Sequence, residues 1–145
     1  MEIVLKQLSV FLENKPGRLL RVCRVMAEEG INIRALSLAD TADFGLVRLI
    51  VDNPDLAAEK LKARDFMVNI TEVVGIKVLD KPGGLVEALE ALEKEQVSVE
   101  YMYAFLGNSG DKAMVILRLD DNALGVAALT KMDIELLTPE EVYSA

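Results

Sequence analysis

Two short segments of the chain combine residue types that could bind a small charged molecule. Residues 14–19 read Asn-Lys-Pro-Gly-Arg-Leu, and residues 80–85 read Asp-Lys-Pro-Gly-Gly-Leu. In each segment a strand is expected to end and a helix to begin near the Pro-Gly pair. The start of a helix has unpaired backbone N–H groups and a partial positive charge, which together bind a carboxylate. An oxygen of Asn14 or Asp80 could accept a hydrogen bond from an ammonium group, so the two features together suit a free α-amino acid.

The same turns also have a purely structural interpretation. Gly17 and Gly83 have no Cβ, which lets a ligand approach the backbone closely, but a Pro-Gly turn commonly does no more than start a helix. Asn14 and Asp80 are residue types that ordinarily cap helices. The two lysines that precede the prolines are expected to be mainly solvated. Both interpretations stay open on the residues alone.

The two segments belong to a longer internal repeat whose offset is 66 residues, the distance from Pro16 to Pro82. The apolar positions after the first turn keep this offset, and Ile-Asn-Ile at residues 31–33 corresponds to Val-Ser-Val at residues 97–99. A repeat of this length in a chain of 145 residues predicts two copies of one small domain. We place these domains at residues 1–72 and 73–145.

Hydrophobic periodicity predicts the same element order in both copies. In the first copy we expect strands at 3–12, 31–38, 46–51 and 66–71, with helices between Pro16 and Gly30 and at 54–63. In the second we expect strands at 73–79, 97–106, 112–120 and 133–137, with helices at 83–94 and 122–130. Turns are expected at 40–43 and 107–110. The order β-α-β-β-α-β is the ferredoxin-like arrangement, an α+β fold in which an antiparallel sheet has both helices on one face.

Composition disfavours several classes of function. The chain has no histidine, and its one cysteine, Cys23, lies in the apolar stripe of the first expected helix. A net charge of −8 without a basic cluster disfavours nucleic acid as a partner. We find no cofactor-binding motif and no metal-spaced residue pair, and therefore expect no catalytic residues, metal or cofactor. Without a signal peptide or a membrane-spanning apolar run, the chain is expected to be cytoplasmic and not membrane-bound.

The repeated segments resemble the ACT domain, a small regulatory module that binds amino acids. The resemblance rests on residues 13–19 and on Glu-Gly-Ile-Asn-Ile at residues 29–33, and residues 80–85 and 97–99 repeat it. It implies two tandem ferredoxin-like βαββαβ domains with antiparallel sheets, and an amino-acid site at an interface between domains. For one pocket it implies the ligand-binding residues Asn14, Pro16, Gly17, Arg18, Leu19, Asn32 and Ile33. For the other it implies Asp80, Pro82, Gly83, Gly84, Leu85, Ser98 and Val99.

Two details of this expected site depend on topology and side-chain type. Asn32 and Ser98, each near the start of a strand, are expected to face the turn of their own copy. Leu19 and Leu85 favour a ligand with an aliphatic or aromatic side chain, whereas Asp80 leaves a cationic side chain open. The second copy departs from the Gly-Ile-Asn-Ile pattern, so its site is the less similar of the two.

The resemblance predicts a non-catalytic amino-acid sensor whose ligand is a free amino acid and whose expected assembly is a homodimer. The first 75 residues are also similar to the regulatory subunit of acetohydroxyacid synthase. A regulatory subunit with a partner enzyme of amino-acid metabolism is therefore the alternative. A purely structural interaction module and a carboxylate-based enzyme are the two remaining hypotheses, and the sequence favours them less.

Overall fold

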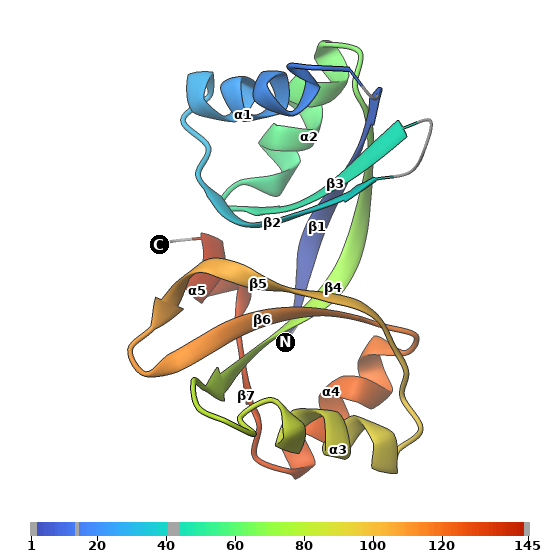
Figure 1. Cartoon of the computed structure of the whole chain (residues 1–145), viewed down its shortest axis with the longest axis vertical. Helices are drawn as coiled ribbons and strands as arrows, with labels where there is room; N and C mark the ends of the chain where they lie inside the picture. Colours follow the sequence, from blue (N-terminus) through green and yellow to red (C-terminus); the bar gives the residue numbers. More distant parts are fainter. Residues whose placement is uncertain (1–2, 14, 41–43, 144–145) are drawn as a thin grey trace. The chain divides into compact units, whose positions relative to one another are not determined.

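The computed structural model describes residues 3–13, 15–40 and 44–143 (Figure 1). The chain divides into two compact units. The N-terminal unit comprises Lys6–Thr71 with the segment that starts at Val142, and the C-terminal unit comprises Glu72–Glu141 with the segment that ends at Leu5. The turn expected at residues 41–43 lies outside the described residues. Among the residues described, no helix combines the length and apolar character that crossing a bilayer requires.

The N-terminal unit follows the expected order of strands and helices. Its elements are β1 Val4–Glu13, α1 Arg18–Glu28, β2 Ile33–Asp40, β3 Phe44–Val51, α2 Pro54–Ala63 and the beginning of β4 Met67–Leu79. Strand β3 lies between β1 and β2 and is antiparallel to both. In this register Glu13 of β1 pairs with Phe44 at one end of β3, and Ile33 of β2 pairs with Val51 at the other end.

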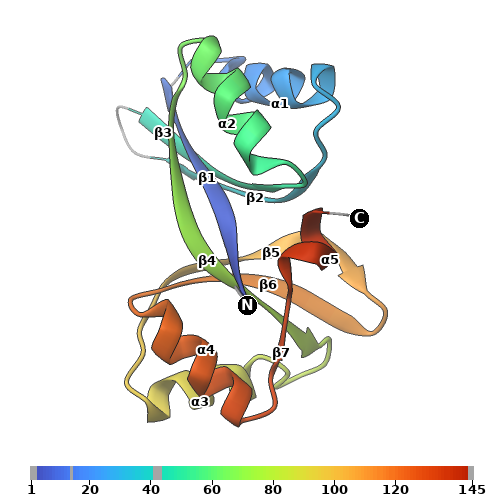
Figure 2. The same cartoon turned by 180° about the vertical axis from the view of Figure 1, so that it is seen from behind.

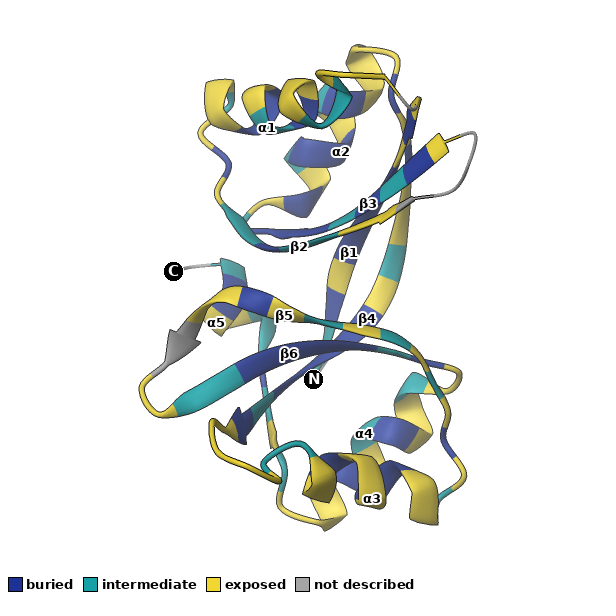
Figure 3. Ribbon diagram, in the orientation of Figure 1, coloured by how far each residue is buried: buried dark blue, intermediate teal, exposed yellow. Residues whose placement is uncertain are grey.

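Both helices of this unit lie on one face of its strands, as the two opposite views in Figures 1 and 2 show. Their apolar sides form one core with alternate residues of β1 and β3, which are buried (Figure 3). The buried members of this core include Leu8, Val10, Leu12, Val22, Val25, Met26, Val47, Leu49, Val51, Ala57 and Leu61. Cys23, expected in this core, is only half-buried, because the buried stripe of α1 runs through Val25 instead.

The C-terminal unit repeats the arrangement with its own core. Its further elements are α3 Val86–Lys94, β5 Val99–Ser109, β6 Lys112–Leu119, α4 Asn122–Lys131, β7 Glu135–Leu136 and α5 Pro139–Tyr143. Strands β5, β6, β4 and β7 pair in that order, each antiparallel to its neighbour. The core combines residues of α3 and α4 with β4 and β6, among them Val74, Ile76, Ala88, Leu92, Leu117, Leu119 and Leu129. The predicted α+β content and antiparallel pairing are therefore confirmed.

Several predicted boundaries were wrong, and three of them matter for the turns and the sheet. The strands expected at 66–71 and 73–79 are one continuous strand, β4, since no turn-forming residue separates them. The hairpin turn expected at 107–110 is shorter, because β5 extends to Ser109 and β6 begins at Lys112. Helix α1 begins at Arg18 rather than at Pro16, because Pro16 belongs to a turn that precedes the helix.

Candidate ligand-binding site

The two Lys-Pro-Gly segments form the same backbone turn. After Pro16, Gly17 has φ +85° and ψ −4°, and the next N–H donates to the Lys15 carbonyl at 3.4 Å. After the second proline, Gly83 has φ +81°, and the next N–H donates to the Lys81 carbonyl at 3.0 Å. Proline followed by a residue with φ near +80° is the signature of a type II turn, which favours glycine at that residue. The backbone therefore accounts for the glycine in both copies.

The space beside both turns is open. A Cβ added to Gly17 or to Gly83 would have no atom within 4 Å. Gly17 is the N-cap of α1 and offers no side chain for the free N–H groups of the first helical turn. An anion could therefore reach the start of this helix without displacing a side chain of the cap residue.

The capping interpretation of Asp80 is wrong. The N-cap of α3 is Leu85, and Asp80 lies before the turn, where its backbone N–H donates to the Asp111 carbonyl at 3.0 Å. The side chain of Asp80 is exposed. Its equivalent in the first copy, Asn14, lies outside the described residues.

The two turns differ at the residue that follows the positive-φ glycine. Arg18 holds this position in the first copy and Gly84 in the second. A Cβ on Gly84 would lie only 1.9 Å from the carbonyl oxygen of Leu79, so a side chain cannot be accommodated without moving the backbone. Helix α3 accordingly begins two residues later in the repeat than α1 does, at Val86. The two candidate sites are therefore not geometrically equivalent.

Glu13 links the two cations of the first turn. Its carboxylate forms an ion pair with Lys15 at 3.0 Å and with Arg18 at 2.6 Å. The hydrogen bond from Lys15, together with the charges of Arg18 and Lys15, holds the pKa of Glu13 below its usual value. Lys15 was expected to be mainly solvated; its side chain is exposed, yet it is also paired. A carboxylate ligand at this turn would have to compete with Glu13 for Arg18.

Asn32 and Ser98 lie away from the turns of their own copies. The Asn32 N–H donates to the side chain of Asp52 at 3.0 Å, and the Ser98 N–H donates to the side chain of Asp120 at 3.0 Å. Asn32 directly precedes β2, whose first residue pairs with the last residue of β3, whereas the first turn follows Glu13, which pairs with the first residue of β3. Ser98 directly precedes β5 in the same way, beside the end of β6, whereas the second turn follows Leu79, beside the start of β6. The expectation that they face their own turn was wrong. They share a pocket with a turn only if that turn belongs to another domain.

The remaining expected site residues contribute mainly to the cores. Leu19 and Ile33 are partly buried against the core of the N-terminal unit, and Leu85 and Val99 against the core of the C-terminal unit. The turn prolines are exposed. The part of each expected site that is free to meet a ligand is thus the turn backbone.

The N-terminal unit has a pocket of about 680 Å³ beside the first turn, which we call the aromatic pocket. Its walls come from the end of β1, the first turns of α1, the start of β3 and the connection from α2 to β4. The lining residues are Phe11, Leu12, Glu13, Arg18, Arg21, Phe44, Arg64, Asp65, Phe66 and Met67. The rings of Phe11 and Phe44 lie 6.0 Å apart and tilted by 50°, a favourable arrangement for two aromatic groups. Only Arg18 of this set belonged to the expected site.

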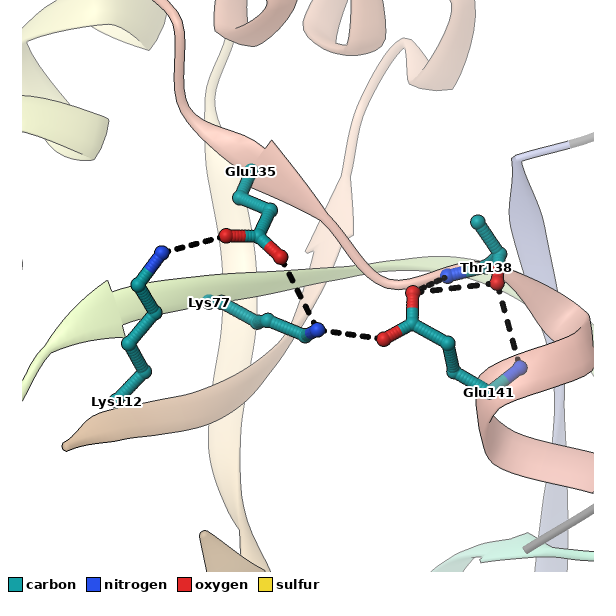
Figure 4. A network of polar contacts seen from close by, with 5 residues as sticks. All are labelled: Lys77, Lys112, Glu135, Thr138 and Glu141. Carbon is teal, nitrogen blue, oxygen red and sulfur yellow. Dashed lines mark hydrogen bonds and ion pairs between the residues drawn. The ribbon is translucent and has the colours of Figure 1, made fainter. Parts of the chain in front are cut away.

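The corresponding place in the C-terminal unit is smaller, about 260 Å³, and charged. Lys77 forms ion pairs with Glu135 at 3.1 Å and with Glu141 at 2.5 Å, and Lys112 pairs with Glu135 at 2.5 Å (Figure 4). Glu141 also accepts hydrogen bonds from Thr138, whose hydroxyl caps the start of α5. We call these five residues the lysine–glutamate network.

The network changes the pKa of its members in a consistent direction. The hydrogen bonds that Lys77 donates to Glu141 and Glu135 raise the pKa of Lys77 above its usual value. The pKa of Glu135 is lowered by Lys112 and Lys77, and the pKa of Glu141 is lowered chiefly by Lys77. Each shift favours the charged form, so the ion pairs are stable near neutral pH.

The aromatic pocket was missed from the sequence because its residues are far apart along the chain. The sequence feature that could have indicated this pocket is the difference in residue type between equivalent positions of the two copies. Phe11 corresponds to Lys77, and Arg21 corresponds to Glu87, each 66 residues later. Among the described residues, no group of three or more histidine, cysteine or acidic side chains is placed to hold a metal ion.

The fold and the repeated turns define a pair of small α+β domains, and the comparisons give their family. The model of the ACT domain pair matches residues 3–142, and the chain therefore belongs to this family. The predicted resemblance is thus confirmed. None of the curated proteins compared with the sequence matches it.

Solved structures with similar folds include one with substantial sequence identity. Protein BT0572 from Bacteroides thetaiotaomicron is 43% identical, with a TM-score of 0.92, and the alignment covers 99% of this chain and 98% of that chain. The regulatory subunit of aspartate kinase from Thermus thermophilus, in its ligand-free form, is 15% identical with a TM-score of 0.66, over 91% and 92% of the two chains. The same subunit from Thermus flavus is 14% identical with a TM-score of 0.58, over 88% and 92%.

Proposed function

We propose that the chain is a non-catalytic regulatory protein that binds a free amino acid through the turns between the first strand and first helix of its two ACT domains. The observation that carries this proposal is the conservation of one backbone turn in both copies of an ACT domain pair, with open space beside each glycine. The turn presents free N–H groups to a carboxylate. The absence of histidine from the sequence supports a role without catalysis.

We further propose that each ACT domain is a ferredoxin-like βαββαβ unit, with the domains at residues 1–72 and 73–145. The element order and the strand pairing of the two halves support this division, while the segment that ends at Leu5 groups with the C-terminal unit and the segment that starts at Val142 groups with the N-terminal unit. In this proposal the turn of one domain meets residues such as Asn32 or Ser98 of another, since neither lies near its own turn. A homodimer would supply such pairs of domains, and the proposed location is the cytoplasm.

The alternative is a regulatory subunit of an enzyme of amino-acid metabolism, such as acetohydroxyacid synthase. Two proteins of similar fold are regulatory subunits of aspartate kinase, which supports a subunit role in general. The two hypotheses differ in what the isolated chain does. A free-standing sensor binds an amino acid by itself, whereas a subunit co-purifies with a larger enzyme from native extract.

The test is a thermal-shift screen of the purified chain against the twenty amino acids. Binding to the folded state raises the melting temperature once the ligand concentration well exceeds the dissociation constant. A shift with one amino acid or a few related ones is expected. No shift with any amino acid, together with a co-purifying enzyme, would favour the subunit hypothesis instead.

The variant that tests the turn is Gly17→Asn. Asparagine tolerates positive φ, so the turn should be kept while a side chain enters the open space, and amino-acid affinity should fall about tenfold or more. The matched control is Gly30→Asn, because Gly30 has φ +68° at the other end of the same helix and also has open space. Equal affinities of the two variants, both folded, would contradict the turn as the binding site.

A further inference from the structure

We propose that the aromatic pocket of the N-terminal unit is a second ligand site, which binds a small organic carboxylate with an apolar body. Arg21 is the partner of the carboxylate in this proposal, and the C-terminal unit has no corresponding site. The inference goes beyond the proposed function, because the pocket and the turn residues share only Arg18. Either site can exist without the other.

Among the described residues, Arg21 is the arginine of the pocket that has no carboxylate partner. Its guanidinium lies over the ring of Phe66, with 5.6 Å between its central carbon and the ring centre. It forms no ion pair with any carboxylate among the described residues. The other two arginines of the wall are already paired, Arg18 with Glu13 and Arg64 with Glu28. An arginine fixed by stacking offers its N–H groups to a ligand carboxylate with little loss of side-chain freedom.

The rest of the pocket is suited to an apolar group. Phe11, Phe44 and Met67 are exposed to 36%, 43% and 70%, which is unusual for large apolar side chains that converge on one hollow. A volume of about 680 Å³ falls within the range of sites for small molecules. An aromatic or branched aliphatic body could therefore cover these side chains while its carboxylate meets Arg21.

The C-terminal unit has opposite chemistry at the equivalent positions. Glu87 stands in the place of Arg21, so the equivalent pocket lacks the arginine that would meet a carboxylate. Lys77, Lys112 and Glu135 line the equivalent pocket, where Phe11, Phe44 and Met67 line the first. The register supports the match, because Phe44 pairs with Glu13 as Lys112 pairs with Leu79.

The charged side chains of the C-terminal unit satisfy one another in the lysine–glutamate network and leave about 260 Å³. A ligand there would meet lysines that are already paired, whereas Arg21 of the aromatic pocket has no ion pair among the described residues. The aromatic pocket and the equivalent pocket of the C-terminal unit thus differ in both charge and volume.

The experiment is calorimetric titration of the full chain at pH 7 with two carboxylates, 3-phenylpropionate and L-phenylalanine. The control ligand is 3-phenylpropan-1-ol, which has the same phenylpropyl body but no carboxylate. Both carboxylates should bind and the alcohol should bind at least tenfold more weakly. In Arg21→Gln, which keeps a side chain of intermediate length and loses the charge, carboxylate affinity should fall about ten- to a hundredfold. Tighter binding of L-phenylalanine would identify an amino-acid site, and tighter binding of 3-phenylpropionate a site for simple carboxylic acids.

Two control variants keep the proposal falsifiable. Glu87→Gln alters the equivalent position of the C-terminal unit and should leave the affinity unchanged, as should Gly30→Asn beyond the other end of α1. Equal affinity of folded Arg21→Gln and the unaltered chain, or equal binding of the alcohol, would overturn the proposal. A third result would also overturn the proposal: no carboxylate binds, and the chain self-associates in a way that Phe44→Ser abolishes. The exposed aromatic groups would then belong to a contact between copies of the chain.

Discussion

At the scale of single residues, the turns show how a repeated motif can conceal a difference. Arg18 and Gly84 hold the same position of the repeat, but only Gly84 faces a backbone carbonyl at a distance that forbids a Cβ. The lysine, proline and glycine before them are identical, so the pattern of the motif predicts two equal turns. The position of the Leu79 carbonyl depends on the fold around the turn, which the motif itself does not contain.

Replacing Gly84 by alanine should destabilise the chain, because the new Cβ must displace the Leu79 carbonyl. We expect the free energy of unfolding to fall by about 1–3 kcal/mol, as for other overpacked sites. Arg18→Ala at the equivalent position should cost less than about 1 kcal/mol, since it removes an ion pair with the exposed Glu13 carboxylate and a partly exposed side chain, and no backbone has to move. Urea unfolding of both variants measures the difference. Equal costs would show that the two turns are equivalent after all.

At the scale of elements, the lysine–glutamate network joins four of them. Lys77 belongs to β4, Lys112 to β6, Glu135 to β7 and Glu141 to α5. Strand β7 has only two residues, so its backbone pairing with β4 is short. The ion pairs of Lys77, whose side chain is only 12% exposed, therefore contribute to holding this edge of the sheet.

The network should make stability depend on pH at both extremes. Glu135 and Glu141 have lowered pKa values, so their contribution is complete above about 4.5, the usual value, and is lost as the pH falls through the lowered values. Lys77 has a raised pKa, so its contribution is complete below about 10.5 and is lost as the pH rises through the raised value.

In the variant Lys77→Met, the melting temperature should fall less steeply at low pH and at high pH than it does in the unaltered chain. Lys62→Met, which replaces an exposed lysine of α2, is the control and should keep the shape of the unaltered chain. An unchanged acid limb in the Lys77 variant would mean that other carboxylates dominate the loss of stability at low pH.

At the scale of the whole molecule, the sequence predicted the duplication and the element order because both rest on local periodicity and on a repeated turn. It did not predict that β4 is continuous, since an uninterrupted apolar strand and two adjoining strands give the same pattern. It also misplaced Asn32, whose position depends on strand register rather than on the order of elements. The sequence did not predict the aromatic pocket, because the walls of this pocket come from four separate parts of the chain.

The lysine–glutamate network has a consequence for how binding at the aromatic pocket would depend on ligand concentration. In our inference the C-terminal unit has no equivalent of this pocket, so one molecule saturates the aromatic pocket of each chain. Occupancy of that pocket then follows a simple hyperbola that rises over about two decades of ligand concentration. Because the ion pairs of Lys77 stand where a second such pocket would be, a steeper response must come from coupling to the turn sites or to other chains.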